Sequence, residues 1–114
     1  MAQSSEFVEF VLESLQPLQG VSARRMFGGW GIYKDGVMFA LIAYDQLYLK
    51  VDDGNRAAYE AAGLPYFTYT DKGRPIRMPY RDAPSEGFDD PDLLCAWARE
   101  ACAAALRTKT PKRG

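Results

Sequence analysis

The sequence predicts one α+β domain with two layers, in which helices cover a mainly antiparallel sheet of five or six strands. Segments typical of helices lie near both ends of the chain, and short apolar segments of strand length fill most of the interval between them. The breaks between these segments are only a few residues long. Short connections favour antiparallel neighbours, and helices pack readily on one face of such a sheet. The expected order is α-β-β-β-β-α-β-β-α.

The first helix is expected to run from Ser4 or Ser5, either of which can cap it, to about Gln16. Apolar residues recur there at spacings of three and four, which indicates a helix packed on a core. Pro17 and Gly20 should end it. The mostly apolar stripe comprises Phe7, Phe10, Val11, Ser14, Leu15 and Leu18.

Four strands should follow in quick succession. The pair Asp35-Gly36 is the strongest local signal, because a type I′ turn needs positive φ at both central positions. A second tight turn is expected at Tyr44-Asp45-Gln46. The predicted strands are Val21–Phe27, Trp30–Lys34, Val37–Tyr44 and Gln46–Val51.

The middle of the chain predicts a short helix over Asn55–Ala62. Asp52 or Asp53 should cap its start, and Gly63 should supply a left-handed stop. Pro65 lies just beyond, where a helix cannot continue.

Two further strands are expected, Tyr66–Thr70 and Pro75–Tyr80, joined by a polar turn over residues 71–74 and followed by a loop over residues 81–89. Asp90 should cap the last helix, with Pro91 at its first position. The domain is therefore assigned to residues 1–106. Residues 107–114 carry four basic residues and no acid, and they are predicted to form a disordered tail.

Composition narrows the possible functions. A net charge of −1, from 14 basic and 15 acidic residues, argues against a dedicated nucleic-acid binder. The acidic N-terminus has no cationic region typical of a signal peptide, and no apolar run approaches the ~20 residues that span a bilayer. We therefore expect a cytoplasmic protein without membrane contact.

The residues available for chemistry are few. Histidine is absent, which excludes Ser-His-Asp and Cys-His catalytic machinery and any zinc site that uses histidine. Cys95 and Cys102 lie too far apart on one helix to form a disulfide and are expected to be reduced core residues. The acidic group at Asp89, Asp90 and Asp92 lacks the ligand spacing of a calcium loop. We expect no cofactor, no metal and no catalytic residue.

A glycine-rich segment at residues 24–31 is the most distinctive feature of the sequence. It lacks the residues of a phosphate-binding loop, and a strand follows it rather than a helix. One interpretation is a tight turn or bulge where backbones approach closely. The other is a recognition edge, since arginine and tryptophan dominate binding hot spots. The candidate partner-binding residues are Arg24, Arg25, Phe27, Gly28, Gly29, Trp30, Tyr33 and Tyr80.

These motifs resemble the N-terminal domain of the TfoX/Sxy competence regulators, whose members carry an R-R-M-F-G-G-x-G-I-Y block. The similarity implies an α+β fold and a link to competence regulation. It also implies, for members with a second, helical domain, co-activation with the cyclic-AMP receptor protein. The resemblance spans roughly residues 20–106. Its blocks are Arg24–Gly29, Asp35–Ala40, Leu47–Val51, Asn55-Arg56, Phe67-x-Tyr69, Met78–Tyr80, Asp89–Asp92 and Trp97-Ala98.

The leading hypothesis is a non-catalytic module that binds a protein partner, with the transcription machinery as one candidate. A small-molecule binder or enzyme with a pocket near Trp30, Tyr33 and Tyr80 is the first alternative. A weak nucleic-acid binder that uses Arg24, Arg25 and the basic tail is the second. A flat apolar patch around Arg24 and Trp30 would favour the protein-binding module. A deep pocket would favour the small-molecule binder or enzyme, and a continuous basic stripe would favour the nucleic-acid binder.

A symmetric homodimer is also expected. The strand predicted over Val37–Tyr44 carries no charge, so it would invite pairing if it lay at the edge of the sheet. Twofold dimers are in addition the commonest soluble oligomers.

Overall fold

The computed structural model describes residues 5–26 and 28–109 of the chain. Helices and strands follow one another in the order that the sequence predicts, with two short 3₁₀ turns added. The elements are α1 (Ser5–Ser14), a 3₁₀ turn (Gln16–Leu18), β1 (Val21–Met26), β2 (Gly29–Lys34), β3 (Val37–Ala43), β4 (Gln46–Lys50), α2 (Arg56–Ala62), β5 (Tyr66–Asp71), β6 (Arg74–Asp82), a second 3₁₀ turn (Ser85–Phe88) and α3 (Pro91–Lys109).

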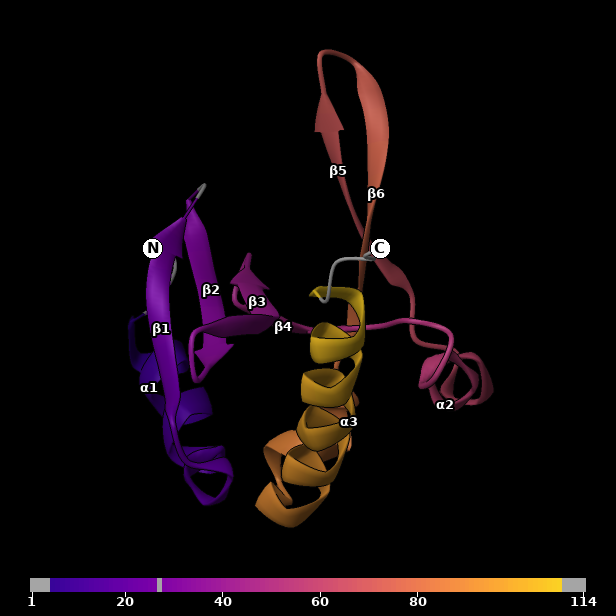
Figure 1. Cartoon of the computed structure of the whole chain (residues 1–114). Coiled ribbons are helices and arrows are strands. Elements are labelled where there is room, and N and C mark those ends of the chain that lie inside the picture. The colour runs from indigo at the N-terminus through magenta and orange to yellow at the C-terminus, as the bar shows by residue number, and fades with distance from the viewer. Residues whose placement is uncertain (1–4, 27, 110–114) are drawn as a thin grey trace.

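The six strands form one sheet in the order β1-β2-β3-β4-β6-β5, and all neighbours in it are antiparallel. The first four strands lie side by side in chain order. The chain then passes through α2 and returns beside β4 with β6, which leaves β5 at the far edge (Figure 1). The predicted α+β class and antiparallel sheet are therefore confirmed.

The turn between β2 and β3 has the predicted geometry. Asp35 has a φ of 51° and Gly36 a φ of 87°, as a type I′ turn requires. Lys34 and Val37 are cross-strand partners on either side of the turn. The hairpin that the Asp-Gly pair predicts is confirmed.

Two other hairpins close in the same way. Tyr44 and Asp45 have φ values of 56° and 57°, and Gln46 already belongs to β4, so this turn is one residue shorter than predicted. Lys72 and Gly73 have φ values of 52° and 79° and join β5 to β6. Type I′ turns match the right-handed twist of the strands that they connect, so tight turns of this kind keep the sheet antiparallel.

The helices α1 and α3 pack on the same face of the sheet and touch each other. The Cys95 thiol on α3 donates a hydrogen bond to the Ser14 carbonyl on α1, with a sulfur–oxygen distance of 3.2 Å. Burial raises the pKa of both cysteine thiols, that of Cys102 to about 11. The core combines Val8, Val11 and Leu15 from α1, Ile32, Phe39, Ala40, Ile42, Leu47 and Leu49 from the sheet, and Leu94, Cys95, Ala98, Ala101 and Ala105 from α3.

Several predicted boundaries need correction. The first helix ends at Ser14, because Pro17 lies in a separate 3₁₀ turn. The predicted loop over residues 81–89 begins later, since β6 continues through Asp82 and a second 3₁₀ turn follows. At the last helix, the Asp90 side chain accepts a hydrogen bond from the Leu93 amide at 3.3 Å, in agreement with its predicted role as cap.

The predicted Asp cap at the start of α2 is wrong. Asn55 occupies the cap position of α2. The Asp52 carboxylate instead receives two hydrogen bonds of 2.7 Å from the Arg107 guanidinium, near the end of α3. The helix α3 continues to Lys109, so the prediction of disorder is wrong for residues 107–109, and the rest of the predicted tail, residues 110–114, lies outside the described residues.

The apolar strand β3 lies inside the sheet, between β2 and β4. Both of its edges are paired there, so the reason given above for dimerisation through this strand does not hold. The edges of the sheet are β1 and β5. Within residues 5–26 and 28–109, no helix is both long and apolar enough to cross a membrane.

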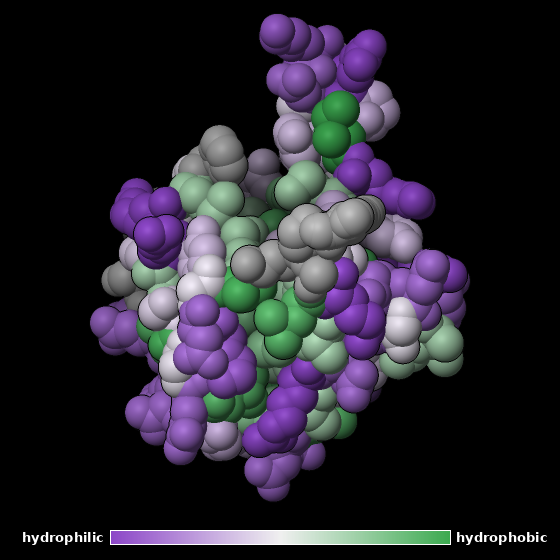
Figure 2. All heavy atoms as spheres, in the orientation of Figure 1, coloured by the Kyte–Doolittle hydropathy of each residue, from purple (hydrophilic) through white to green (hydrophobic). Residues whose placement is uncertain are grey.

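The hairpin of β5 and β6 projects from the body of the domain (Figure 1). The last four residues of β5 and the first two of β6 are exposed. Hydrophilic side chains gather at its tip (Figure 2). Only the base of this hairpin, where β6 pairs with β4, belongs to the packed part of the sheet.

The ion pair between Asp52 and Arg107 yields a prediction about acid stability. Hydrogen bonds from Arg107 are the main reason that the pKa of the Asp52 carboxyl lies below its ordinary value of 3.8. Such a carboxyl stabilises the fold above its unfolded-state pKa, and this contribution is lost as the pH falls through the folded-state pKa. Arg107→Met should therefore lower the free energy of unfolding at neutral pH.

Chemical denaturation at several pH values measures this effect. The difference between the Arg107→Met variant and the unaltered protein should shrink as the pH falls below 3.8. Arg99→Met is the matched control, because Arg99 is an exposed arginine of the same helix. An equal loss in both variants, or a loss that does not depend on pH, would contradict the prediction.

Candidate functional site

The helices leave the opposite face of the sheet uncovered, and this face is the candidate functional site. Successive residues of a strand point to opposite sides, so one residue in two of each central strand contributes to it. We call it the uncovered face. It includes Arg24, Met26, Tyr33, Met38, Leu41, Tyr48, Lys50, Phe67, Tyr80 and Asp82.

Gly31 lies at the centre of a cluster of long side chains on this face. A Cβ atom at this position would lie 2.7 Å from the Met26 sulfur, 3.1 Å from the Tyr33 ring and 3.2 Å from the Met38 sulfur. Three strands thus bring their side chains together over one residue without a side chain of its own. The glycine makes room for a close methionine and tyrosine cluster.

Two cations lie over tyrosine rings on the same face. The guanidinium carbon of Arg24 is 5.3 Å from the centroid of the Tyr33 ring, and the Lys50 nitrogen is 5.2 Å from that of Tyr80. Both distances fall within the range of a cation–π interaction. These contacts hold the Arg24 and Lys50 side chains against the sheet. Part of the side-chain conformational entropy that binding a partner would cost is therefore already lost in the free protein.

Aromatic rings continue this surface toward the projecting hairpin. Tyr48 on β4 and Phe67 on β5 have ring centroids 4.6 Å apart, and Tyr69 follows at 6.2 Å from Phe67. Phe67 and Tyr48 are half-buried, whereas Tyr69 is 40% exposed. The uncovered face therefore passes without a break from the packed sheet onto the base of the hairpin.

Burial controls the ionisation of groups on this face. It raises the pKa of Tyr80 to about 12, with a smaller contribution from Tyr33 nearby. Burial also lowers the pKa of Lys50, and the charge of Asp52 partly offsets this effect. Tyr80 therefore remains protonated near neutral pH and can donate a hydrogen bond, while burial makes the charged form of Lys50 less favourable.

The structure brings together three of the predicted site residues and separates the others. Arg24, Tyr33 and Tyr80 share the uncovered face. Arg25 and Trp30 point to the helix side, where Trp30 packs against the core and the Arg25 guanidinium lies 5.2 Å from the centroid of its ring. The two adjacent arginines thus lie on opposite faces and form no continuous basic stripe.

The glycines of the motif have a structural role, as the first interpretation proposed. Gly28 has a φ of 77°, which favours glycine, in the turn between β1 and β2. A Cβ atom on Gly29 would overlap the backbone carbonyl oxygen of Ile42. Gly29 therefore allows β2 and β3 to approach each other closely. Phe27 lies outside the described residues.

The sequence analysis did not select Met26, Met38 or Phe67. Met26 lies opposite Gly29 on the paired strand, and Gly29 and Tyr33 share one face of β2, so strand alternation is a signal that could have found Met26. Met38 is the cross-strand partner of Tyr33, a relation that follows from the Asp35-Gly36 turn. Phe67 could not be found in this way, because no turn connects its strand to β4.

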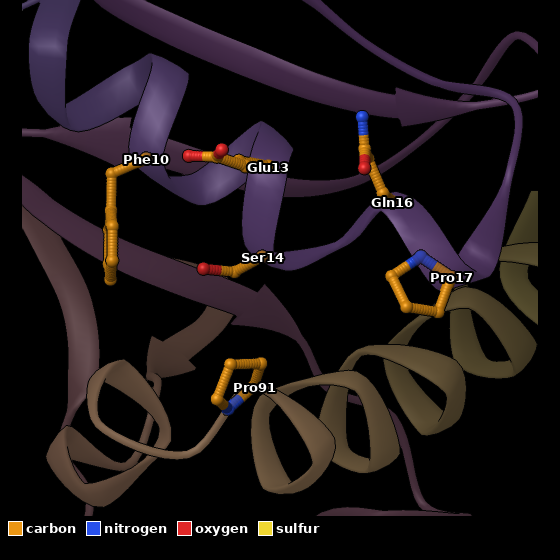
Figure 3. Close-up of a pocket in the computed structure, with 6 residues that line it drawn as sticks. All are labelled: Phe10, Glu13, Ser14, Gln16, Pro17 and Pro91. Atoms are coloured by element: carbon orange, nitrogen blue, oxygen red, sulfur yellow. The ribbon is translucent and has the colours of Figure 1, made fainter.

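A hollow on the helix side is unrelated to these residues. It measures about 620 Å³ and lies between α1 and the start of α3 (Figure 3). Among the described residues that line it, Glu13 and Ser14 supply the only carboxylate and hydroxyl, and none is a predicted site residue. In the part of the chain that the structure describes, no group of three or more acidic, cysteine or histidine residues could hold a metal ion. The lining comprises Phe10, Glu13, Ser14, Gln16, Pro17 and Pro91.

Comparison with known proteins agrees with this fold. The model of the TfoX N-terminal domain matches residues 13–105, which include every strand and most of α3. The chain belongs to this family. No curated protein matches it. The motif that carried the resemblance now has a physical meaning in this TfoX N-terminal domain, since it forms the β1–β2 hairpin and two of the three cation–π pairs described above.

The two buried glycines of β2 in this TfoX N-terminal domain should respond differently to substitution. Gly29→Ala places a Cβ atom against rigid backbone and should destabilise the fold by about 3 kcal/mol. Gly31→Ala meets flexible methionine side chains, which can move, and should cost less than about 1 kcal/mol. Thermal and denaturant unfolding measure both effects. The reverse order of stabilities would contradict the packing described here.

Proposed function

We propose that this TfoX N-terminal domain is a non-catalytic regulatory module that binds a protein partner through the uncovered face. The family suggests a regulatory role related to competence. The single observation that carries the proposal is the composition of this face, whose side chains include arginine, lysine, methionine, tyrosine and phenylalanine. Except for lysine, these are the residue types enriched at protein interfaces.

The shape of the face also supports a protein partner. The backbone beneath it is rigid, because β2, β3 and β4 are paired on both sides. Its methionines are flexible and can adapt to a partner surface, whereas its tyrosines lose little entropy on binding. Exposed Arg24 is held over Tyr33 at one side of the face, so it can contact an acidic group of the partner.

Replacement of Arg24 tests this proposal. Arg24→Glu should weaken binding to the physiological partner at least about tenfold, as expected for an interface hot spot. Arg99→Glu carries the same charge change on an exposed part of α3 and should leave binding unchanged. The partner is first identified by photo-crosslinking from position 33 in the native cytoplasm, and affinities are then measured by calorimetry.

A regulatory readout completes the test. In a strain in which the variants replace the native protein, Arg24→Glu should change expression of the regulated genes and Arg99→Glu should not. Both variants should unfold at the temperature of the unaltered protein, which separates lost binding from lost structure. Equal effects of the two variants, or a partner that crosslinks to the helix side instead, would refute the proposal.

A further inference from the structure

The hollow between α1 and the start of α3 has an aromatic wall that the fold leaves partly open to solvent (Figure 3). Phe10 lines it and is 38% exposed, one of the few large hydrophobic side chains at the surface. The centroid of its ring lies 6.4 Å from that of Phe7 and 6.2 Å from that of Phe88, and both of these pack against the core. Pro17 and Pro91 add apolar surface. The hollow therefore offers a fixed apolar centre to a large side chain of another molecule.

Every charged side chain of the two segments that form this hollow is acidic. Residues 5–20 carry three carboxylates and residues 85–98 carry four, whereas neither segment contains a lysine or an arginine. All of these carboxylates are exposed, and in the described part of the chain none of them takes part in a salt bridge. They belong to Glu6, Glu9, Glu13, Glu86, Asp89, Asp90 and Asp92.

Helix geometry places two of these carboxylates beside Phe10. Residues three and four apart are neighbours on the surface of a helix, so Glu6 and Glu13 flank the exposed ring along α1. Glu13 also lines the hollow. Asp90 and Asp92 precede and follow the proline of the opposite wall (Figure 3). We call these four carboxylates the acidic rim, because they surround an apolar centre with charge of one sign.

The projecting hairpin carries charge of the opposite sign. Residues 72–77 contain three basic side chains, all exposed, and no acid. This hairpin and the start of α3 lie at opposite ends of the molecule (Figure 1). The net charge of −1 for the whole chain thus conceals a strong separation of charge. Such a separation attracts cationic molecules to the hollow and repels anionic ones.

We propose that the hollow binds a basic segment of a protein partner. One large apolar side chain of this segment packs against Phe10 and Pro91, and its lysines or arginines lie at the acidic rim. An apolar centre inside a polar rim is the usual arrangement of a protein interface. Glu6 and Glu13 are seven residues apart, which is roughly 10 Å along a helix and more than a small cation spans. The extent of the rim therefore favours a protein segment over a free cation.

This surface is independent of the uncovered face. The hollow lies on the helix side of the sheet, and its rim is acidic, whereas Arg24 and Lys50 give the uncovered face exposed or partly exposed cations. The two surfaces therefore select partners of opposite charge. A domain that carries both can hold two different molecules at the same time, and this inference does not depend on the function proposed above.

Two labelled peptides test the proposal. The first has arginines on both sides of one phenylalanine, and the second has serine in place of that phenylalanine. Fluorescence polarisation should show that the first peptide binds the unaltered protein and that the second binds at least about tenfold more weakly. Binding of the first peptide should also weaken as the salt concentration rises, because salt screens exposed charges. Equal affinities of the two peptides, or no binding of the first, would overturn the proposal.

Variants of the protein locate the contact. Phe10→Ala should weaken binding of the first peptide at least about tenfold, and Glu13→Arg at least about threefold. Leu106→Ala and Asp71→Arg are the matched controls, because they make comparable changes at exposed positions near the end of α3 and on the hairpin. Glu13 is exposed, so its replacement should leave the unfolding temperature unchanged even if Phe10→Ala lowers it. Equal losses of affinity in Glu13→Arg and Asp71→Arg would contradict the assignment.

Light scattering distinguishes a different protein from a second copy of this chain as the occupant. The basic hairpin of a second copy carries the charge that the acidic rim attracts, so self-association is the competing result. We expect the solution mass at micromolar concentration to be the same for the unaltered protein, Glu13→Arg and Arg77→Glu. A self-association that both substitutions abolish would assign the hollow to a second copy and overturn the proposal.

Discussion

The packing of α3 on the two central strands is the contact on which the rest of the structure depends. Small residues such as Ala98, Ala101 and Ala105 line its inner side, so the helix axis can come close to β3 and β4. The helix also holds α1 in place through Cys95 and the loop before α2 through Arg107. Because both long helices pack on this one side, the other side of the sheet is left to side chains that pack on one another.

This one-sided packing explains the composition of the uncovered face. Without a helix above them, its side chains must satisfy two requirements, to shield the sheet and to remain compatible with water. Tyrosine, lysine and arginine meet both, because each has an apolar body and a polar end. Arg24 over Tyr33 and Lys50 over Tyr80 are examples, since the cation remains near solvent while it covers the ring. A surface that is stable on its own in this way is also suited to bind a partner.

The topology assigns different properties to the two ends of the sheet. The strands β1 to β4 are joined by tight turns and lie against the helices, so both the turns and the helix packing fix their register. The strand β6 is longer than its neighbours, and only its last part pairs with β4. The remainder, together with β5, extends beyond the core. At one end, arginine side chains protect the edge, whereas at the other end β5 carries no charge before Asp71 and its last four residues are exposed.

The fold could be predicted from the sequence largely because its signals are local. The Asp35-Gly36 turn, the left-handed stop at Gly63 and the start of α3 at Asp90 depend on the conformation of a few adjacent residues. Such preferences act in any context, so they fixed the element order and most of the strand boundaries. The predicted Asp cap at the start of α2 was wrong, since Asn55 takes that position and the Asp52 carboxylate binds Arg107, 55 residues away in the chain.

The sequence by itself determined the order of elements, the tight turns and the family. Which faces and edges these elements present was decided only by the tertiary structure. Alternation along β1 shows that Arg24 and Arg25 point to opposite sides, but not which side the helices cover. An apolar strand such as β3 can lie at an edge or in the centre, and only the return of β6 beside β4 placed it inside. These choices depend on contacts between residues far apart in the chain, which the local preferences of single residues do not specify.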